Sequence, residues 1–534
     1  MKQVSVPKGR VVLYFPILYA QWPMWSPLCM FALAAALMAE GYEVTLIDER
    51  VDEDPRGWLE KELPGALLVG IPSKLGGQCR NMESTAEFIK AKNRDVAVVA
   101  GGWFPSLFPE QTMTSENIDI IVIGPGDFAL PEVANRLLEG RSLDGIENVF
   151  FKRNGKIVKN QVNHLPSLEK TVPIPWEIVG IKRYLHPHGW INYFSSRGCP
   201  GGCVFCSIHC LDPRRWTALS PERVIEDLET LVHKIGARAF QITDADFCAS
   251  LKRVEGICRL IQERGLQIRF HVLGRYQTLV RMSDEQVRLL RQSGCTEIEV
   301  GLESGSQSVA DSINKQVDVE RFVETARRFS AAGIRMRVNV MLGIPGETRK
   351  DLVSTFRKML ELRELGDGIR FQMFRFTPLP DSEIGKKVLS VSANGRAHRV
   401  PTTYRELLEF PVIDEETEMY WIDAKHERDV KRSYSFYAPL LFYKVALDSA
   451  EGRPWWRFAL KCFIPLARWR VARARFAFPF ELWLNRAFGR RMPLGTDAGI
   501  PHPEDQLPVP EMGQAFDDLP PLEPSLSSKD MRGR

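Results

Sequence analysis

Runs of apolar residues alternate with amphipathic stretches through the first part of the chain, up to about residue 135. A short, continuous apolar run is typical of a strand that is buried on both faces of a sheet, whereas apolar positions spaced three and four apart are typical of a helix. Their alternation predicts a parallel, doubly wound α/β sheet, in which ligands bind beyond the C-terminal ends of the strands. The predicted strands are residues 11–17, 44–49, 66–72, 96–102 and 118–124.

A second series of apolar runs, also separated by helical patterns, begins near residue 190. Because six such units follow one another, the pattern predicts an incomplete barrel of parallel strands rather than the closed form with eight units. The chemistry of such barrels lies at the C-terminal ends of the strands. The predicted strands are residues 191–197, 237–244, 267–275, 296–304, 334–342 and 369–378.

The other segments differ in pattern and complete the predicted organisation of the chain. Residues 150–160 predict a hairpin with an Asn-Gly turn. Residues 400–491 are rich in aromatic residues and arginine and show no strand alternation, and the proline-rich, acidic end predicts a disordered tail. We predict a Rossmann-like domain at 8–145, a hairpin and linker at 146–185, the partial barrel at 186–395, a helical C-terminal region at 396–493 and the tail at 494–534.

Composition narrows the class of protein. A chain of 534 residues is longer than one hydrophobic core usually requires, and its net charge of +4 gives no sign of a nucleic-acid partner. The N-terminal residues lack the apolar core of a signal peptide, and no stretch reaches the ~18 apolar residues of a membrane span. We therefore expect a cytoplasmic, reducing setting.

Three of the ten cysteines are closely spaced on a glycine-rich loop after the first predicted barrel strand. Cys199, Cys203 and Cys206 have the spacing C-x3-C-x2-C, and clustered thiols in a reducing compartment predict a metal or redox site. Zinc would need a fourth ligand from His209 or Cys210, whereas three thiolates on an iron–sulfur cluster leave one iron open. Six others are predicted to be small core residues, namely Cys29, Cys79, Cys248, Cys258, Cys295 and Cys462.

The cysteine loop RGCPGGCVFCS (197–207), placed at the start of a six-unit barrel, resembles that of the radical S-adenosylmethionine (SAM) enzymes. Further segments resemble the cobalamin-binding branch of that superfamily, the class B radical SAM methyltransferases. These segments are TDADF (243–247), GLESGS (301–306) and MLGIPGET (341–348) in the barrel, and GGWFPSLFPE (101–110) and GPGD (124–127) in the first domain. The resemblance spans about residues 10 to 385.

The resemblance implies three cofactors, a [4Fe–4S] cluster, SAM and cobalamin. Cys199, Cys203 and Cys206 would ligate three irons, SAM would chelate the fourth, and Cys210 would be a bystander. The GGE signature with which the wider superfamily binds the SAM amino group is not present as such. SAM contacts are expected from Glu303, Ser304, Asp244 and Arg275, the last of which could instead form an ordinary salt bridge. Cobalamin contacts are expected from Ser73, Lys74, Gly101, Gly102, Gly124 and Gly126.

None of the nine histidines lies in the first domain, and the D-x-H-x-x-G motif of cobalamin mutases is missing. That domain therefore cannot supply an imidazole to cobalt, and the loop at residues 72–78 is the expected neighbour of its lower face. A cobalt without a strong axial ligand should give up a methyl group more easily, which favours methyl transfer.

The resemblance implies methylation of an unactivated carbon through a 5′-deoxyadenosyl radical and methylcobalamin. An external electron donor such as flavodoxin or ferredoxin is expected. Some relatives cyclise or rearrange their substrates, as in the anaerobic ring-forming enzyme of chlorophyll biosynthesis, so a cyclase of tetrapyrrole type stays open. A non-catalytic cobalamin-binding sensor is the alternative from another class, although it would not need the intact cysteine loop.

The C-terminal region carries the only clue to the substrate. Residues 453–491 mix tryptophan and phenylalanine with many arginines, a composition typical of helices that lie on a membrane surface. The alternatives are a helical cap with solvated arginines, or RNA binding. Because the arginines at 468, 470, 473 and 475 are spaced two or three apart, we expect them on more than one face of a helix, with weak, peripheral attachment to the membrane at its inner face. A lipid or polycyclic small-molecule substrate becomes plausible.

Overall fold

The computed structural model describes residues 6–17, 25–74, 76–163, 166–208, 214–390, 392–393, 396–397, 401–409, 419–442, 454–473 and 475. The chain forms two compact units. The first comprises Met1–Tyr184, Ser196–Ala218 and Phe376–Asp423, and the second comprises Leu185–Ser195, Leu219–Arg375 and Ala424–Arg534. The loop with the three cysteines therefore belongs to the first unit.

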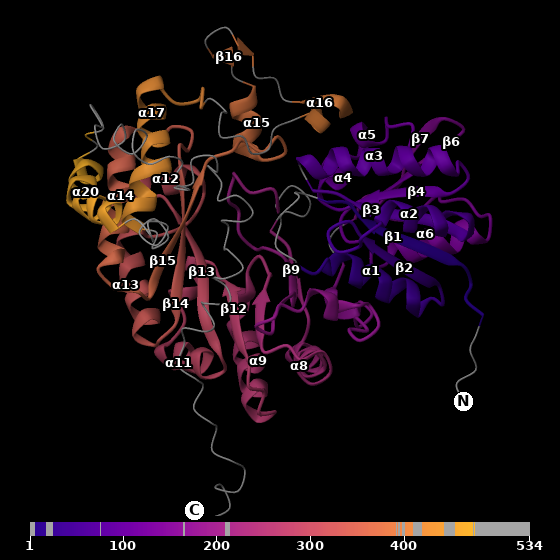
Figure 1. The fold of residues 1–534 in the computed structure, drawn as a ribbon, viewed down its shortest axis with the longest axis horizontal. Helices are drawn as coiled ribbons and strands as arrows, with labels where there is room; N and C mark the ends of the chain where they lie inside the picture. Colours follow the sequence, from indigo (N-terminus) through magenta and orange to yellow (C-terminus); the bar gives the residue numbers. More distant parts are fainter. Residues whose placement is uncertain are drawn as a thin grey trace, which may run out of the picture. The chain divides into compact units, whose positions relative to one another are not determined.

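The first unit is built on a seven-stranded sheet with the order β2-β1-β3-β4-β5-β6-β7 (Figure 1). Its first five strands are parallel, and the last two add as an antiparallel hairpin. The strands are β1 (Arg10–Phe15), β2 (Glu43–Asp48), β3 (Ala66–Pro72), β4 (Ala97–Gly101), β5 (Ile120–Val122), β6 (Val149–Arg153) and β7 (Lys156–Lys159). This confirms the predicted doubly wound domain.

Helices follow the strands because each connecting segment has an apolar side. They are α1 (Leu28–Ala39), α2 (Pro55–Glu62), α3 (Gly77–Lys92), α4 (Trp103–Leu107), α5 (Pro109–Thr112) and α6 (Ala129–Leu138). Alternate residues of β1 face opposite sides of the sheet. On one side, Val12 and Tyr14 join a core with α2, α3 and α4. Helix α1 contacts β1 and β2 and packs with α6. Helix α16 (Tyr404–Glu409) completes the first core with Tyr404 and Leu407.

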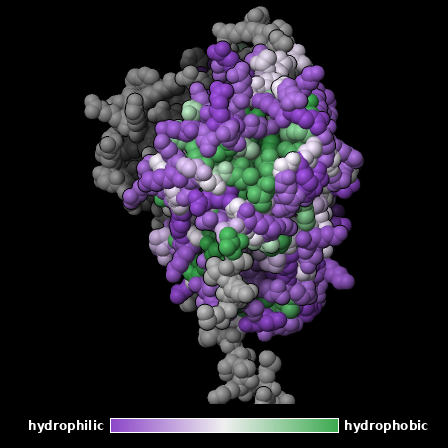
Figure 2. Space-filling view, turned by 90° about the vertical axis from the view of Figure 1, so that its right-hand side faces the viewer, coloured by the Kyte–Doolittle hydropathy of each residue, from purple (hydrophilic) through white to green (hydrophobic). Residues whose placement is uncertain are grey.

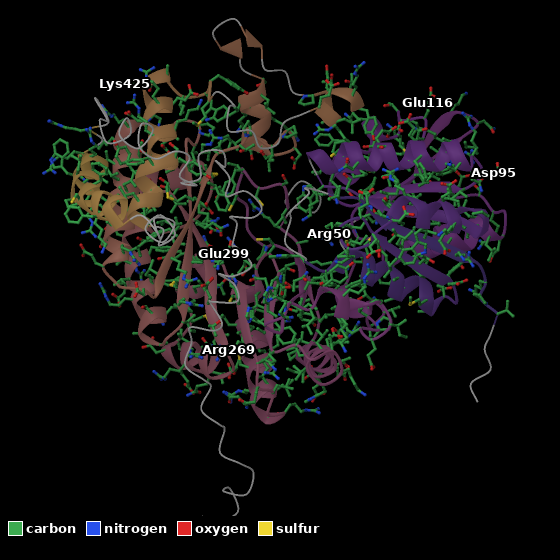
Figure 3. All side chains as sticks on the ribbon, viewed as in Figure 1. Arg50, Asp95, Glu116, Arg269, Glu299 and Lys425 are labelled. Carbon is green, nitrogen blue, oxygen red and sulfur yellow. The ribbon has the colours of Figure 1, made fainter. Side chains whose placement is uncertain are left out.

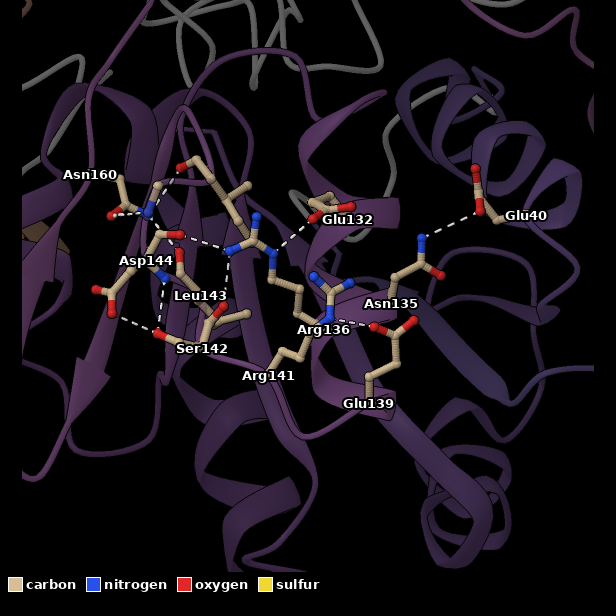
Figure 4. A network of polar contacts seen from close by, with 12 residues as sticks. Glu40, Glu132, Asn135, Arg136, Glu139, Arg141, Ser142, Leu143, Asp144 and Asn160 are labelled. Carbon is tan, nitrogen blue, oxygen red and sulfur yellow. Dashed lines mark hydrogen bonds and ion pairs between the residues drawn. The ribbon is translucent and has the colours of Figure 1, made fainter.

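The predicted hairpin turn is present between β6 and β7. Asn154 and Gly155 have φ values of 51° and 72°, which is the left-handed pair that a two-residue Asn-Gly turn needs. Side chains tie this hairpin to the end of α6 (Figure 4). Arg136 donates to the Ser142 and Asp144 carbonyls at 2.9 and 2.7 Å, and Asn160 of the strand segment donates to the Leu143 carbonyl at 2.8 Å.

The surface seen from the side of β6 and β7 is mainly hydrophilic, with a larger apolar area in its upper middle and smaller ones below (Figure 2). Isolated exposed apolar side chains are normal on folded proteins. The most exposed large one between residues 30 and 400 among the described residues is Ile178, at 70%.

The second unit contains an open, fully parallel sheet of six strands with the order β15-β14-β13-β12-β11-β8. The strands are β8 (Trp190–Tyr193), β11 (Ala239–Ile242), β12 (Arg269–Leu273), β13 (Cys295–Glu303), β14 (Arg335–Leu342) and β15 (Ile369–Arg375). Helices α8 (Pro221–Thr230), α9 (Leu251–Glu263), α11 (Asp284–Gln292), α13 (Val319–Ala331) and α14 (Arg349–Arg363) lie along one side of this sheet (Figure 1). The predicted partial barrel is confirmed.

Alternation along the barrel strands separates an apolar from a polar side. Ile298, Val300, Leu302 and Val338 are at most 1% exposed on the helix side, as expected for side chains with a period of two. The other side carries Glu297 and its neighbours, described below.

Two of the six cysteines predicted to lie in cores are exposed instead. Cys29 lies in the first turn of α1, and Cys462 lies on the outer side of α20 (Pro454–Arg473). Although accessible, the Cys29 thiol is closely surrounded by protein, and this burial raises its pKa despite the nearby cations of Lys74, Arg50 and Arg197. The prediction is confirmed for Cys79, Cys248, Cys258 and Cys295, which are buried.

Candidate functional site

The three cysteines lie on an irregular loop that follows β9 (Ser196–Gly198), a short strand paired antiparallel with β10 (Trp216–Ala218). All three are partly exposed and none forms a disulfide. The Cys206 N–H donates to the Cys203 carbonyl at 3.1 Å, and the Gly201 N–H lies 3.4 Å from the Cys199 sulfur. Cys210 and His209 lie outside the described residues.

The donor set of this loop fits an iron–sulfur cluster. Partly exposed thiols on an irregular, glycine-rich backbone are the groups that such clusters take as ligands. Among the described residues, no three His, Cys, Asp or Glu side chains converge on a point that could hold a single metal ion.

An arginine directly before the cysteine loop joins it to the loop after β5. Arg197 forms a bidentate pair with the nearly buried Asp127, with nitrogen–oxygen distances of 2.5 and 3.0 Å. Two parallel charge-assisted hydrogen bonds of this kind fix orientation as well as distance. The segment expected to hold the cluster and the Gly124–Gly126 segment expected to contact cobalamin are therefore held together within the first unit.

The loops after β3, β4 and β5 are hydrogen-bonded to one another. The Ser73 N–H donates to the Gly101 carbonyl at 2.9 Å, and the Ser106 hydroxyl donates to Gly102 and accepts from Gly124 at 2.5 and 2.8 Å. Gly102 has a φ of 81°, and a Cβ there would lie 2.9 Å from the Ser73 carbonyl oxygen, so only glycine fits. Gly124 also has positive φ, at 70°, and open space beside it. Because these backbone segments carry no bulky side chains, a flat cofactor can approach them closely.

The loop after β3 presents one cation. Ser73 is buried, and its hydroxyl donates to the Lys74 carbonyl at 2.9 Å. The Lys74 ammonium is accessible but closely surrounded by protein, and this desolvation, with the positive charge of Arg50, lowers its pKa. Leu75 lies outside the described residues. Gly126 packs close to α1, since a Cβ there would lie 3.1 Å from Leu33.

Glu303, at the end of β13, is held in an unusual backbone conformation. Its φ is 64°, a left-handed value that costs a non-glycine residue of order 1 kcal/mol or more. The Lys315 ammonium lies 2.6 Å from the Glu303 carboxylate, which occupies the space left by the missing side chain of Gly301. Strain kept at a strand end beside a paired carboxylate is typical of a binding site.

The other residues expected to contact SAM differ in whether their polar atoms already form hydrogen bonds within the protein. Both carboxylate oxygens of Asp244 accept hydrogen bonds from Ser195, at 2.6 Å each. Ser304 is fully buried, with its hydroxyl 3.1 Å from that of Thr355. Arg275 is partly exposed and contacts Gln316 at 3.5 Å. The structure thus brings these residues to the C-terminal ends of β11, β12 and β13, and Asp244 and Ser304 mainly stabilise the strand ends.

Asp246 is the carboxylate that sequence reasoning missed. It is fully buried, and neither carboxylate oxygen has a hydrogen-bond partner among the described residues. Burial raises its pKa to about 6, although Arg275 and nearby backbone N–H groups oppose that rise. Buried ionisable groups without partners are concentrated at functional sites. The Asp-x-Asp pattern of TDADF was the available signal, because it places two carboxylates after one strand.

A buried histidine from the C-terminal region supports the loop after β14. His426, in α17 (Ala424–Arg432), lies 3.0 Å from Glu347, and both side chains are inaccessible to solvent. Burial raises the pKa of Glu347, opposed by His426. Thr348 and Asp351 form a capping box that starts α14 immediately afterwards. The G-I-P-G-E segment is therefore fixed from two sides.

The inner side of the sheet has a charged layer. Although burial opposes ionisation, Arg337 at 2.5 Å and neighbouring cations hold the pKa of Glu297 at about 2. Burial lowers the pKa of the adjacent His271 to about 3, so this imidazole is neutral. Arg269 and Glu299, on β12 and β13, belong to the same two strands (Figure 3).

On β14 and β15, the inner side becomes less polar towards the C-terminal strand ends. Residues two apart in a strand share a face, so Met341 follows Arg337 on the inner side of β14, and its neighbour across the sheet is Phe374. On β12, Leu273 is in register with Glu299 and through it with Arg337, so it lies level with the charged layer. At this end of β14 and β15 the side chains of Met341 and Phe374 present an apolar contact next to the charged layer.

Comparison with protein families gives two matches. The family model of the radical SAM superfamily matches residues 193–359, and that of the B12 binding domain matches residues 23–134. Among curated proteins, the chain is 28% identical over 342 residues to an uncharacterized methyltransferase of Pyrococcus horikoshii, covering 62% of this chain and 73% of that protein. It is 23% identical to the anaerobic magnesium-protoporphyrin IX monomethyl ester cyclase of Rubrivivax gelatinosus, covering 68% and 67%.

Two of the solved structures that share this fold are radical SAM proteins that bind cobalamin. One is the radical SAM methyltransferase TsrM from Kitasatospora setae with cobalamin and a [4Fe–4S] cluster, with a TM-score of 0.61 and 20% identity over 72% of this chain and 75% of that one. The other is the cobalamin-dependent SAM radical enzyme OxsB with aqua-cobalamin and SAM, with a TM-score of 0.68 and 16% identity over 96% and 79%. At these identities the likeness establishes the fold.

Proposed function

The chain belongs to the cobalamin-binding branch of the radical SAM superfamily, and we propose that it methylates an unactivated carbon in an apolar, lipid-like or polycyclic substrate. Its cofactors are a [4Fe–4S] cluster, SAM and cobalamin. The observation that most favours methylation is that no histidine occurs before residue 164, so this domain has no imidazole to offer to cobalt. The relative in Pyrococcus horikoshii that is named a methyltransferase supports the same choice.

The residues of this chain have distinct parts in the proposed reaction. When bound, the cluster and SAM supply radical chemistry, and cobalamin carries the methyl group. Cys199, Cys203 and Cys206 would hold the cluster, and Lys315 would keep the Glu303 carboxylate oriented at the strand end. The glycine loops after β4 and β5 would receive cobalamin.

The overall reaction balances with two molecules of SAM and two electrons from an external donor such as flavodoxin or ferredoxin. A methyl group replaces one carbon-bound hydrogen of the substrate, and that hydrogen leaves in 5′-deoxyadenosine. One SAM becomes S-adenosylhomocysteine, and the other yields methionine and 5′-deoxyadenosine.

The substrate class is supported by the inner side of the barrel sheet. Met341 and Phe374 are neighbouring apolar side chains at the C-terminal ends of β14 and β15, where the reacting part of a substrate is expected. A cyclase is the second candidate, favoured by the similarity to the Rubrivivax gelatinosus protein.

The proposed function can be tested with SAM that carries a deuterated methyl group. Reduced holoenzyme would be incubated with apolar and polar extracts of the organism that encodes the chain. We expect a deuterated methyl group in a product of the apolar extract, identified by mass spectrometry. Label only in the polar extract would contradict the substrate class, and an unlabelled product that has lost hydrogen would support the cyclase instead.

A further inference from the structure

Helix α20 packs one side on the second unit and leaves the other side exposed. It contacts α14 and α18 (Ala438–Phe442), and Arg357 of α14 donates to the Ala472 carbonyl at 3.2 Å. Ala467 and Val471 are 1% and 0% exposed on the packed side. The exposed side chains are Phe458, Lys461, Cys462, Pro465, Arg468, Trp469 and Arg473.

The exposed side of α20 has an apolar centre with cations along its edges. At 100° per residue, Phe458, Cys462, Pro465 and Trp469 lie within about 60° of one another. Phe458 is 70% exposed and Trp469 41%, although large aromatic side chains of soluble proteins are usually covered. Lys461 and Arg468 lie along one edge and Arg473 along the other, and no acidic residue occurs in the helix.

The arginines lie on more than one side of the helix, as their spacing predicted. Arg470 is buried and donates to the Arg475 carbonyl at 2.7 Å. The Arg473 and Arg475 guanidinium groups lie over the Trp469 ring, each 5.8 Å from its centroid. No carboxylate among the described residues pairs with the cations on the exposed side. Sequence spacing alone could not show that Arg470 is the buried arginine, because its burial depends on the contacts that it makes in the folded chain.

We propose that the exposed side of α20 docks this enzyme on an anionic phospholipid surface. An apolar strip flanked by cations is complementary to a membrane whose headgroups are negative and whose interior accepts aromatic rings. The helix lies flat, since no helix among the described residues is long and apolar enough to cross a membrane. This surface is independent of the chemistry proposed above, and vesicle binding requires no turnover.

Co-sedimentation of the holoenzyme with vesicles tests the proposal. Neutral phosphatidylcholine vesicles would be compared with vesicles that also contain phosphatidylglycerol. We expect binding to the anionic vesicles that weakens as salt is raised, because salt screens exposed charges. Since each basic residue near an anionic surface contributes about fivefold in affinity, the double variant Arg468→Gln/Arg473→Gln should bind roughly 30-fold more weakly.

A separate variant tests the apolar strip. Phe458→Ser should weaken vesicle binding about tenfold, since it removes a buried ring from the lipid. Ile178→Ser is the matched control, because Ile178 is also 70% exposed but lies in the first unit. Arg259→Gln/Arg327→Gln controls for the charge change on exposed helices. Equal melting temperatures and cobalamin content would show that all variants are folded.

The outcomes separate the proposal from its rivals. Loss of anionic-vesicle binding in both α20 variants, with unchanged controls, supports it. Wild-type protein that ignores anionic vesicles overturns it, as do α20 variants that bind like the wild type. Arginine-dependent binding to RNA that is insensitive to Phe458→Ser, without vesicle binding, would assign the surface to a nucleic acid and equally overturn the proposal.

Discussion

Replacing Cys199, Cys203 or Cys206 by alanine is expected to remove the iron–sulfur cluster and all reductive cleavage of SAM. Each thiol supplies one of three protein ligands, and a cluster with two has a second iron open to solvent and reagents. Iron and sulfide analysis, the visible absorption of the reconstituted protein and 5′-deoxyadenosine production would each fall to background. This is the largest effect that any single substitution should have.

Two other cysteines serve as controls for this prediction. Cys210→Ala should keep the cluster, since the resemblance assigns Cys210 no ligand role. Cys462→Ala removes an exposed thiol from α20 and should change neither cluster content nor SAM cleavage. Loss of the cluster in Cys210→Ala, with retention in one of the first three variants, would show that the ligand assignment is wrong.

Replacing Asp246 by asparagine is expected to stabilise the protein at neutral and higher pH while impairing SAM cleavage. The folded-state pKa of Asp246 is raised from 3.8 to about 6, so its contribution to stability is present below pH 4 and is lost as the pH rises through 6. A shift of about two pKa units corresponds to about 3 kcal/mol of ionisation cost at pH 8. An amide avoids this cost, so thermal unfolding at pH 8 should occur at a higher temperature.

Asp244 provides the contrasting variant. Its carboxylate accepts two hydrogen bonds from Ser195, so Asp244→Asn should destabilise the protein by about 1–3 kcal/mol at pH 8. The two substitutions therefore have opposite signs although the residues are two positions apart. If Asp246→Asn were destabilising at pH 8 and neutral for SAM cleavage, Asp246 would be a structural group rather than one retained for function.

The sequence predicted those elements whose local residue pattern is compatible with only one kind of structure. Continuous apolar runs became β1 and β3 because strands buried on both faces have no polar alternation. The turn at Asn154 and Gly155 was predictable because few residue pairs adopt two left-handed conformations in succession. The three cysteines could be predicted to be cluster ligands because their spacing alone resembles the cysteine loop of the radical SAM enzymes.

Contacts between distant parts of the chain could not be predicted. Arg197 and Asp127 are 70 positions apart, and Glu347 and His426 are 79 apart, so no local pattern indicates either pair. Cys29 was misplaced because the periodicity of α1 is almost uniformly apolar and does not indicate which side is exposed. Asp246 was missed because the burial of a carboxylate and its lack of a partner depend on the folded surroundings, which the sequence does not show.

The most direct test of the proposed methylation is the set of products that one enzyme forms from SAM. Purified protein would be reconstituted with iron, sulfide and cobalamin, reduced, and incubated with SAM, and the nucleoside products would be quantified by chromatography and mass spectrometry. We predict that both S-adenosylhomocysteine and 5′-deoxyadenosine form, and that Cys203→Ala abolishes 5′-deoxyadenosine. Formation of 5′-deoxyadenosine without any S-adenosylhomocysteine would contradict the methyltransferase assignment.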